Sequence, residues 1–141
     1  WNRLEFRRYR KCLYLLPAQQ TWASDIVPRM LMKLGADVPE TGVRLRIFKT
    51  VGRGLRAKDV DLSKIKIDGY RKNTKIRLSW NQKTRALSNL FQELGVPPWE
   101  RWRIPVLSID GVVIHVPTVG STASFSATGN EPSIQFLLEE I

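Results

Sequence analysis

The chain has 141 residues, of which 43% are hydrophobic and 26% are charged. This balance is that of an ordinary globular domain with a buried core, which argues against disorder. No apolar run approaches the roughly 18 residues that a membrane-spanning helix needs, so we expect a soluble, cytoplasmic protein without a membrane partner. Cys12 is the only cysteine and His115 the only histidine, which leaves no disulfide framework and no metal site of the usual Cys/His spacing.

The formal net charge of +10 predicts an anionic partner, and this charge is unevenly distributed along the chain. Residues 43–85 hold fourteen Lys and Arg against three Asp and Glu, which is a net charge of +11. Residues 1–42 carry +3 and residues 86–141 carry −4. Mixed signs would serve solubility, so the cation density of the middle third favours a binding surface over a solvated basic face without a partner.

Residues 4–16 alternate and are rich in β-forming side chains, which predicts two short strands joined by a turn at Arg10-Lys11. The segments that follow are predicted as a loop, a strand and a turn, at 17–28, 30–34 and 40–42. We therefore interpret residues 1–42 as connecting strands that lead into a domain at 43–141.

A period of two at the start of this domain indicates a half-buried strand with a cationic exposed side. Its buried positions are Val43, Leu45 and Ile47, and its exposed positions are Arg44 and Arg46. The same alternation predicts later strands with buried positions at Ile65 and Ile67 and at Ile76, Leu78 and Trp80. We expect these strands to bury one face and to present basic side chains on the other.

One amphipathic helix is predicted at about 84–94. Its apolar side chains follow the spacing of a single helix face, at Leu87, Leu90, Phe91 and Leu94. Thr84 or Asn81 can cap its start, and Gly95 suits the left-handed position after its end.

Two cations, Lys83 and Arg85, fall at the start of this predicted helix. A cation is unfavourable beside the positive end of the helix dipole, so these residues do not serve helix stability. A phosphate bound at the helix start would resolve the conflict.

The Asp110-Gly111 pair predicts the tight turn of a hairpin between strands at 106–109 and 112–116. The remaining chain is predicted as a mobile loop rich in Gly, Ser and Thr and then a final strand, at 120–132 and 133–138. Together these elements predict an α+β fold with a small mixed or antiparallel sheet, one main amphipathic helix and a C-terminal hairpin.

No residue of this chain is predicted to be catalytic. A nucleophile would need His115 as its base, and this histidine lies between two apolar strand residues with no acidic neighbour in the sequence. The Gly-Arg-Gly segment at 52–54 lacks the Gly-Lys-Ser/Thr ending of a nucleotide-binding loop, so it is predicted as a turn. Trp99, beside a Pro-Pro pair, is typical of packing, whereas for Trp80 core packing and stacking on an unpaired base are equally open.

Residues 91–99 read Phe-Gln-Glu-Leu-Gly-Val-Pro-Pro-Trp, within a longer distinctive stretch at 84–107. This stretch closely resembles the C-terminal domain of the tRNA(Ile)-lysidine synthetase family, in which a similar run is followed by an Asp-Gly hairpin. The resemblance is strong over 75–117 and looser over most of the remaining chain, including the two opening strands.

The resemblance implies part of an enzyme that uses ATP, with magnesium, to join lysine to the wobble cytidine of an isoleucine tRNA. The family's chemistry belongs to a Ser-Gly-Gly-x-Asp-Ser loop in an N-terminal ATP pyrophosphatase domain, and this loop is absent from the chain. We therefore expect this part to be non-catalytic and to hold no cofactor of its own. The implied partners are tRNA, gripped by its acceptor arm, and the enzyme's own N-terminal catalytic domain.

The predicted tRNA-binding residues are basic side chains around the predicted helix, namely Lys75, Arg77, Lys83, Arg85, Arg101 and Arg103. A cationic sheet face and a basic helix start suit an A-form stem, which proteins read by its backbone and shape. Two alternatives stay open. One is a non-catalytic docking module whose basic stretch pairs with an acidic surface of the catalytic part, and the other is a general RNA-binding domain.

Overall fold

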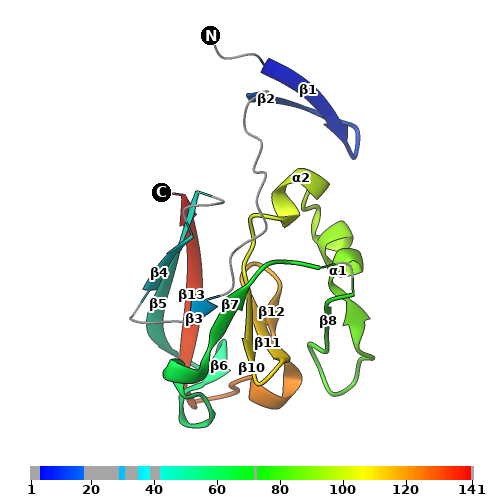
Figure 1. Cartoon of the computed structure of the whole chain (residues 1–141). Helices are drawn as coiled ribbons and strands as arrows, with labels where there is room; N and C mark the ends of the chain where they lie inside the picture. Colours follow the sequence, from blue (N-terminus) through cyan, green and yellow to red (C-terminus); the bar gives the residue numbers. More distant parts are fainter. Residues whose placement is uncertain (1–3, 18–28, 31–34, 39–41, 72, 141) are drawn as a thin grey trace.

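A computed structural model describes residues 4–17, 29–30, 35–38, 42–71 and 73–140. Every strand pairing in this part of the chain is antiparallel. The strands form two larger sheets and two two-stranded ribbons, with the helices gathered at one side (Figure 1). The predicted α+β class with one main helix is confirmed, although the strands make two sheets where one small sheet was expected.

The first ribbon pairs β1 (Leu4–Tyr9) with β2 (Cys12–Pro17), as predicted. Arg10 and Lys11 form its turn with φ angles of 49° and 63°. Both central residues of a type I′ turn adopt this left-handed conformation, so the turn matches the twist of the strands without the usual glycine. Figure 1 shows this hairpin at the end of the molecule nearest α2 (Pro98–Arg101).

One larger sheet has the order β4-β5-β13-β6. Its strands are Gly35–Val38, Val43–Val51, Pro132–Glu140 and Leu55–Arg56. The ladder between β5 and β13 runs the full length of both strands. Val43 and Leu45 on β5 are buried together with Ile134 and Phe136 on β13. Both predicted strands are therefore confirmed, and so is the buried face predicted for Val43 and Leu45.

The other larger sheet has the order β12-β11-β10-β7-β3. Its strands are Gly120–Ser121, Val112–Val116, Val106–Ile109, Lys66–Asp68 and Arg29–Met30. The predicted hairpin between β10 and β11 is confirmed. Asp110 and Gly111 have φ angles of 50° and 80°, so this second turn also has the type I′ conformation.

The five-stranded sheet buries both of its faces, because alternate residues of its strands enter two different apolar clusters. On β10, Leu107 joins the cluster that packs against the four-stranded sheet. Its neighbour Val106 joins the cluster formed with α1 (Leu87–Leu94). Two 3-10 turns, η1 (Ala57–Asp59) and η2 (Leu62–Lys64), carry the chain from the first sheet to the second.

Helix α1 buries Leu87, Leu90 and Phe91 as predicted, but it begins at Leu87 and the predicted start at residue 84 is wrong. Ala86 occupies the N-cap without a side-chain hydrogen bond, so neither Thr84 nor Asn81 caps the helix. Residues 84–86 are lost to the helix because Arg85 and Ala86 pair with another strand instead.

The predicted end of the helix is confirmed at Gly95, whose φ of 75° and ψ of 24° are left-handed. The N–H of Val96 reaches back to the carbonyl of Phe91 at 2.9 Å. This bond satisfies one of the carbonyls that a helix end leaves without a partner, and it closes the last turn.

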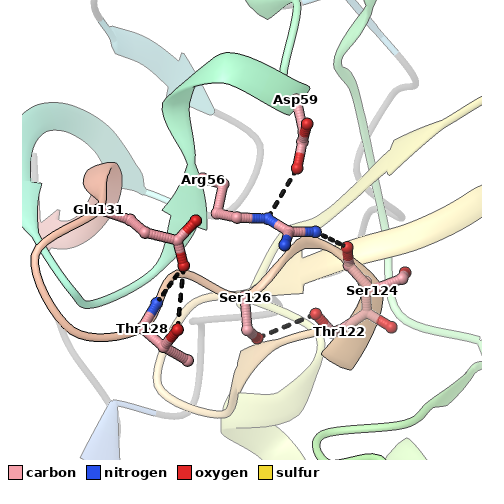
Figure 2. Close-up of polar contacts among 7 residues, drawn as sticks. All are labelled: Arg56, Asp59, Thr122, Ser124, Ser126, Thr128 and Glu131. Carbon is pink, nitrogen blue, oxygen red and sulfur yellow. Dashed lines mark hydrogen bonds and ion pairs between the residues drawn. The ribbon is translucent and has the colours of Figure 1, made fainter.

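Residues 120–132 were predicted to be a mobile loop; the structure corrects this in part by placing two short regular elements within the loop, and its mobility stays a prediction. The segment contains β12 and η3 (Ala123–Phe125), and Figure 2 shows its polar contacts, including the bond from Arg56 to the backbone of Ser124. Arg56 pairs with Asp59 at 2.7 Å and donates to the carbonyl oxygen of Ser124. Glu131 accepts hydrogen bonds from the N–H and the hydroxyl of Thr128 at 2.9 and 3.0 Å. The bond between Arg56 and Ser124 joins segments 68 residues apart in the sequence, which composition does not reveal.

The predicted domain boundary near residue 43 stays a prediction. Strands β3 and β4 precede it and yet pair with β7 and β5, which favours a start before Arg29. The predicted loop at 17–28, most of the strand predicted at 30–34 and most of the turn at 40–42 lie outside the described residues. Among the helices that are described, none is long and apolar enough to cross a membrane.

Candidate nucleic-acid interface

A short ribbon of two strands, β8 (Lys75–Ile76) and β9 (Arg85–Ala86), stands beside α1. Ile76 is buried in the apolar cluster that contains the helix. The N–H of Leu87, the first residue of α1, donates to the carbonyl oxygen of Thr74 at 2.9 Å. The β8–β9 ribbon is therefore fixed to the domain at its base, and this pairing is what takes residues 85 and 86 from the predicted helix.

The segment 69–92, which spans the β8–β9 ribbon and most of α1, holds six Lys and Arg and no Asp or Glu. Lys75 and Lys83 have exposed side chains, while Arg77 and Arg85 are half-buried. Four of the six predicted binding residues therefore come together on one ribbon and its connecting loop, as Figure 1 shows for β8 and the chain that follows it.

Arg77 shapes the loop between the two strands, residues 77–84, which we call the ribbon loop. Its Nε donates to the carbonyl oxygens of Gln82 at 2.9 Å and Ser79 at 3.2 Å. Its Nη2 donates to the carbonyl oxygen of Trp80. From the opposite side, the backbone of η3 donates to the carbonyl oxygen of Arg77 at 2.7 Å. One guanidinium thus holds most of the ribbon loop in shape while adding its charge to it.

The strand predicted through Ile76, Leu78 and Trp80 is wrong beyond Ile76, where β8 ends. The hydrogen bonds of Arg77 turn the chain, so the period of two breaks down. Leu78 is half-buried, and Trp80 is 64% exposed instead of facing the core. The guanidinium carbon of Arg77 lies 5.1 Å from the centre of the Trp80 ring, within the range of a cation–π contact.

Arg85 forms a two-point ion pair with Glu93, near the end of α1. Its Nη1 donates to Oε2 of Glu93 at 3.0 Å, and its Nη2 pairs with Oε1. These hydrogen bonds lower the pKa of Glu93 and raise the pKa of Arg85. The prediction that Arg85 lies in the first helical turn is wrong, since it belongs to β9. Its charge is directed to Glu93 and not to the helix start.

Arg101 and Arg103 occupy the turn after α1, where both contact the chain itself. Arg101 donates to the carbonyl oxygen of Val96 at 2.9 Å and to Oε1 of Gln92 at 3.0 Å. Arg103 has a side chain only 8% exposed and pairs with Glu100 at 3.1 Å. The contacts of Arg101 tie α2 to the end of α1, while the burial of Arg103 favours a positioning role for that residue over direct contact with a ligand.

At least three of the eight basic side chains of residues 43–68, those of Arg46, Arg56 and Lys66, lie within 4 Å of a carboxylate. Arg46 on β5 pairs with Glu139 on β13 at 2.8 Å. Asp68 lies 3.9 Å from Lys66 and 3.6 Å from Arg71. Sequence reasoning treated 43–85 as one basic region, whereas these pairs separate its first part from the β8–β9 ribbon.

His115 is buried on β11, and its Nδ1 lies 2.7 Å from Oγ of Ser121. Burial lowers the pKa of His115 from 6.5 to about 4, so the ring is neutral at pH 7. It borders a cavity of about 390 Å³ that the turn at 52–54 also lines. This turn is confirmed, with Gly52 and Gly54 at positive φ angles of 73° and 83°. The described residues contain no group of three His, Cys, Asp or Glu that could hold a metal ion.

Sequence reasoning did not include Arg71 among the binding residues, although its side chain is exposed just before the β8–β9 ribbon. It also left the position of Trp80 open. The signal that could have found both is the absence of Asp and Glu from 69–92, which isolates one stretch within the larger basic region.

Comparison with curated proteins finds relatives that are tRNA(Ile)-lysidine synthases. That of Alkalilimnicola ehrlichii is 29% identical over 99% of this chain and 31% of its own length. Those of Legionella pneumophila and Xanthomonas axonopodis are 30% and 34% identical, over 78% and 76% of this chain and 24% and 23% of theirs. The chain thus spans less than a third of the length of these relatives.

A solved structure described as the crystal structure of the TILS C-terminal domain shares the fold, with a TM-score of 0.54 and 19% sequence identity. The match covers 72% of this chain and 86% of that one. Residues 65–138, which include the β8–β9 ribbon, both helices and the hairpin, match the family described as the TilS substrate C-terminal domain. This match spans more than half of the chain, which therefore belongs to the TilS substrate C-terminal domain family.

Proposed function

We propose that this chain is the C-terminal, tRNA-binding part of an ATP-dependent ligase that joins lysine to the wobble cytidine of isoleucine tRNA. The family match and the names of the relatives support the identity of the enzyme. In this proposal the chain is not itself catalytic. ATP, with magnesium, acts in an N-terminal catalytic domain, which is this chain's protein partner in the cytoplasm, and we assign none of the described residues to ATP.

The observation that carries the binding role is the stretch 69–92, which has six cations and no acidic residue. Within it, Lys75 and Lys83 are exposed. We propose that these two lysines contact phosphates directly and that Arg77 and Arg85 raise the local positive potential. Arg101 and Arg103 belong to the same proposed site, with Arg103 holding the turn beside it.

The acceptor arm of a tRNA is an A-form stem, whose deep and narrow major groove hides the base edges from side chains. A protein that binds such a stem therefore relies on the phosphates and the shape of the backbone. A narrow cationic ribbon that projects lysines from a rigid base meets this requirement. It supplies positive charge along a line of side chains.

The test compares three RNA probes at one ionic strength, using the 141-residue chain. The probes are isoleucine tRNA, a duplex of its acceptor arm, and its anticodon stem-loop. We expect the tRNA and the acceptor-arm duplex to bind with affinities within about threefold of each other. The anticodon stem-loop should bind about tenfold more weakly, because it offers a shorter line of phosphates.

Equal binding of the two small probes would reduce the proposal to general RNA binding. Failure of all three to bind would overturn it and favour the docking module, whose basic face would instead bind an acidic surface of the catalytic domain. A control with Arg46→Glu, on the sheet far along the chain from the β8–β9 ribbon, should leave all three affinities within about twofold.

A further inference from the structure

The ribbon loop exposes a tryptophan that the proposed phosphate contacts do not use. Trp80 is the largest aromatic side chain exposed to this extent among the described residues. Exposed indole surface is unfavourable in water by roughly 25 cal/mol for each Å² that burial would remove. A leucine or a serine would serve a solvent-facing turn at least as well, so the indole requires another reason.

The ribbon loop holds Trp80 in a fixed position. Its backbone closes through the N–H of Gln82, which donates to the carbonyl oxygen of Ser79 at 3.1 Å. The hydroxyl of Ser79 accepts from the N–H of Asn81 at 3.3 Å. The carbonyl oxygen of Trp80 itself accepts from Arg77. The cost of ordering the residue is therefore met before any ligand binds, which is the condition for a preorganised contact.

The surroundings of Trp80 are cationic. Arg77 lies over its ring at 5.1 Å, Lys83 is exposed three residues further on, and no Asp or Glu occurs from 69 to 92. An aromatic face next to positive charge is the combination on which unpaired bases stack while their phosphates are neutralised. The same positive charge would repel a basic peptide, and residues 69–92 offer such a peptide no carboxylate to pair with.

We propose that Trp80 stacks on an unpaired nucleotide at the 3′ end of the acceptor arm, next to the duplex whose phosphates the lysines of the β8–β9 ribbon contact. This inference rests on the proposed function and names the feature of the RNA that the ribbon loop binds. A duplex end is the place where a stem offers a base with a free face, and stacking is tolerant of base identity because every base has one. The loop therefore distinguishes a stem with a single-stranded 3′ extension from a blunt stem.

The experiment uses the full chain and two acceptor-arm duplexes, one blunt and one with a four-nucleotide single-stranded 3′ extension. The wild type should bind the extended duplex roughly tenfold more tightly, the scale of one base stacked on an aromatic ring. Trp80→Ala should lose this preference and bind both probes like the blunt duplex. Trp80→Phe should keep most of it, because a smaller ring can still stack. Val112→Ala, at an exposed apolar position on the other hairpin, is the matched control and should behave as the wild type.

Fluorescence provides a second readout. The extended duplex should quench part of the wild-type tryptophan emission, and this part should be missing in Trp80→Phe. Equal affinity of the wild type for both duplexes would overturn this inference and leave the proposed function standing. So would an equal loss of both affinities in Trp80→Ala, since it would show only that the ribbon loop needs the indole for its shape. Failure of the wild type to bind either duplex would overturn the proposed function and this inference with it.

Discussion

Strand β5 and the β8–β9 ribbon are both rich in arginine and lysine, and they differ in what lies opposite them. β5 carries Arg46, and its ladder partner β13 supplies Glu139, which pairs with it at 2.8 Å. The acidic C-terminal strand thus neutralises part of the basic strand within the fold. An exposed pair of this kind contributes little to stability, but it reduces the charge that this sheet offers to an anion.

The β8–β9 ribbon has no such partner strand, because its two strands pair only with each other among the described residues and both belong to the acid-free stretch 69–92. Glu93, just beyond that stretch, pairs with Arg85. The number of cations along a chain is therefore a poor guide to binding. What matters is whether the fold brings an acid across from each cation, and only the three-dimensional pairing decides this.

The largest expected effect comes from reversing charge on the ribbon. Lys75→Glu combined with Lys83→Glu should weaken tRNA binding by about 100-fold or more, since each exposed lysine loses a charge-assisted contact and each new carboxylate repels phosphate. The matched control reverses two charges on β5, Arg46→Glu with Lys49→Glu, and should change the affinity by less than about fivefold. Titration of tRNA at one ionic strength measures both. Equal losses in the two variants would mean that net charge alone governs binding.

A second prediction concerns the stability of the fold and not the charge of the β8–β9 ribbon. Since burial lowers the pKa of His115 to about 4, the native protein keeps the ring neutral while the unfolded chain takes up a proton near its ordinary pKa of 6.5. The contribution of this group to the free energy of unfolding is therefore complete above pH 6.5. About 3 kcal/mol of it is lost as the pH falls toward 4.

Denaturant unfolding at pH 7 and pH 4 measures this effect against His115→Gln, which cannot titrate. The free energy of unfolding of the wild type, taken relative to that of this variant, should fall by about 3 kcal/mol from pH 7 to pH 4. A constant difference would show that His115 is accessible to protons in the native state. Affinity for tRNA at pH 7 should be the same in both proteins, because the buried ring is neutral at this pH and bonds to Ser121 instead of facing the solvent.

The smallest expected effect concerns Glu93, which pairs with Arg85 of this ribbon. Glu93→Gln removes the carboxylate that Arg85 faces and leaves the arginine available to phosphate. We expect tRNA affinity to rise about two- to threefold at low salt, with a melting temperature changed by less than about 2 °C, because an exposed ion pair contributes little to stability. Unchanged or reduced affinity would show that Arg85 serves only to hold the ribbon to α1.

The regular elements could be predicted because local patterns determine them. Alternation located β5 and β7, positive-φ turn residues located the hairpin of β10 and β11, and Gly95 with the prolines after it located the end of α1. The start of α1 could not be found in this way. Residues 84–86 are compatible with a helix, and only the pairing of Arg85 and Ala86 with Ile76 and Lys75 makes that part of the chain extended.

The candidate site was predictable to a similar degree. Charge identified Lys75 and Lys83, and the structure exposes both. Charge did not distinguish Arg103 from the exposed cations. The spacing of three residues between Glu100 and Arg103 was visible in the sequence, but the burial of Arg103 was not. Trp80 escaped prediction because its exposure depends on the hydrogen bonds that Arg77 makes to the backbone, and nothing in a period-two pattern announces them.

The claim that the lysines of the β8–β9 ribbon meet phosphates is tested most directly by the salt dependence of tRNA binding in the wild type and in Lys75→Gln combined with Lys83→Gln. If about five phosphates are neutralised, the logarithm of the wild-type affinity should fall against the logarithm of salt concentration with a slope of roughly −4 to −5. Removing two contacts should make the slope shallower by roughly 2. A variant with weaker binding but the same slope as the wild type would contradict the account, since the lysines would then affect binding without contacting the phosphates.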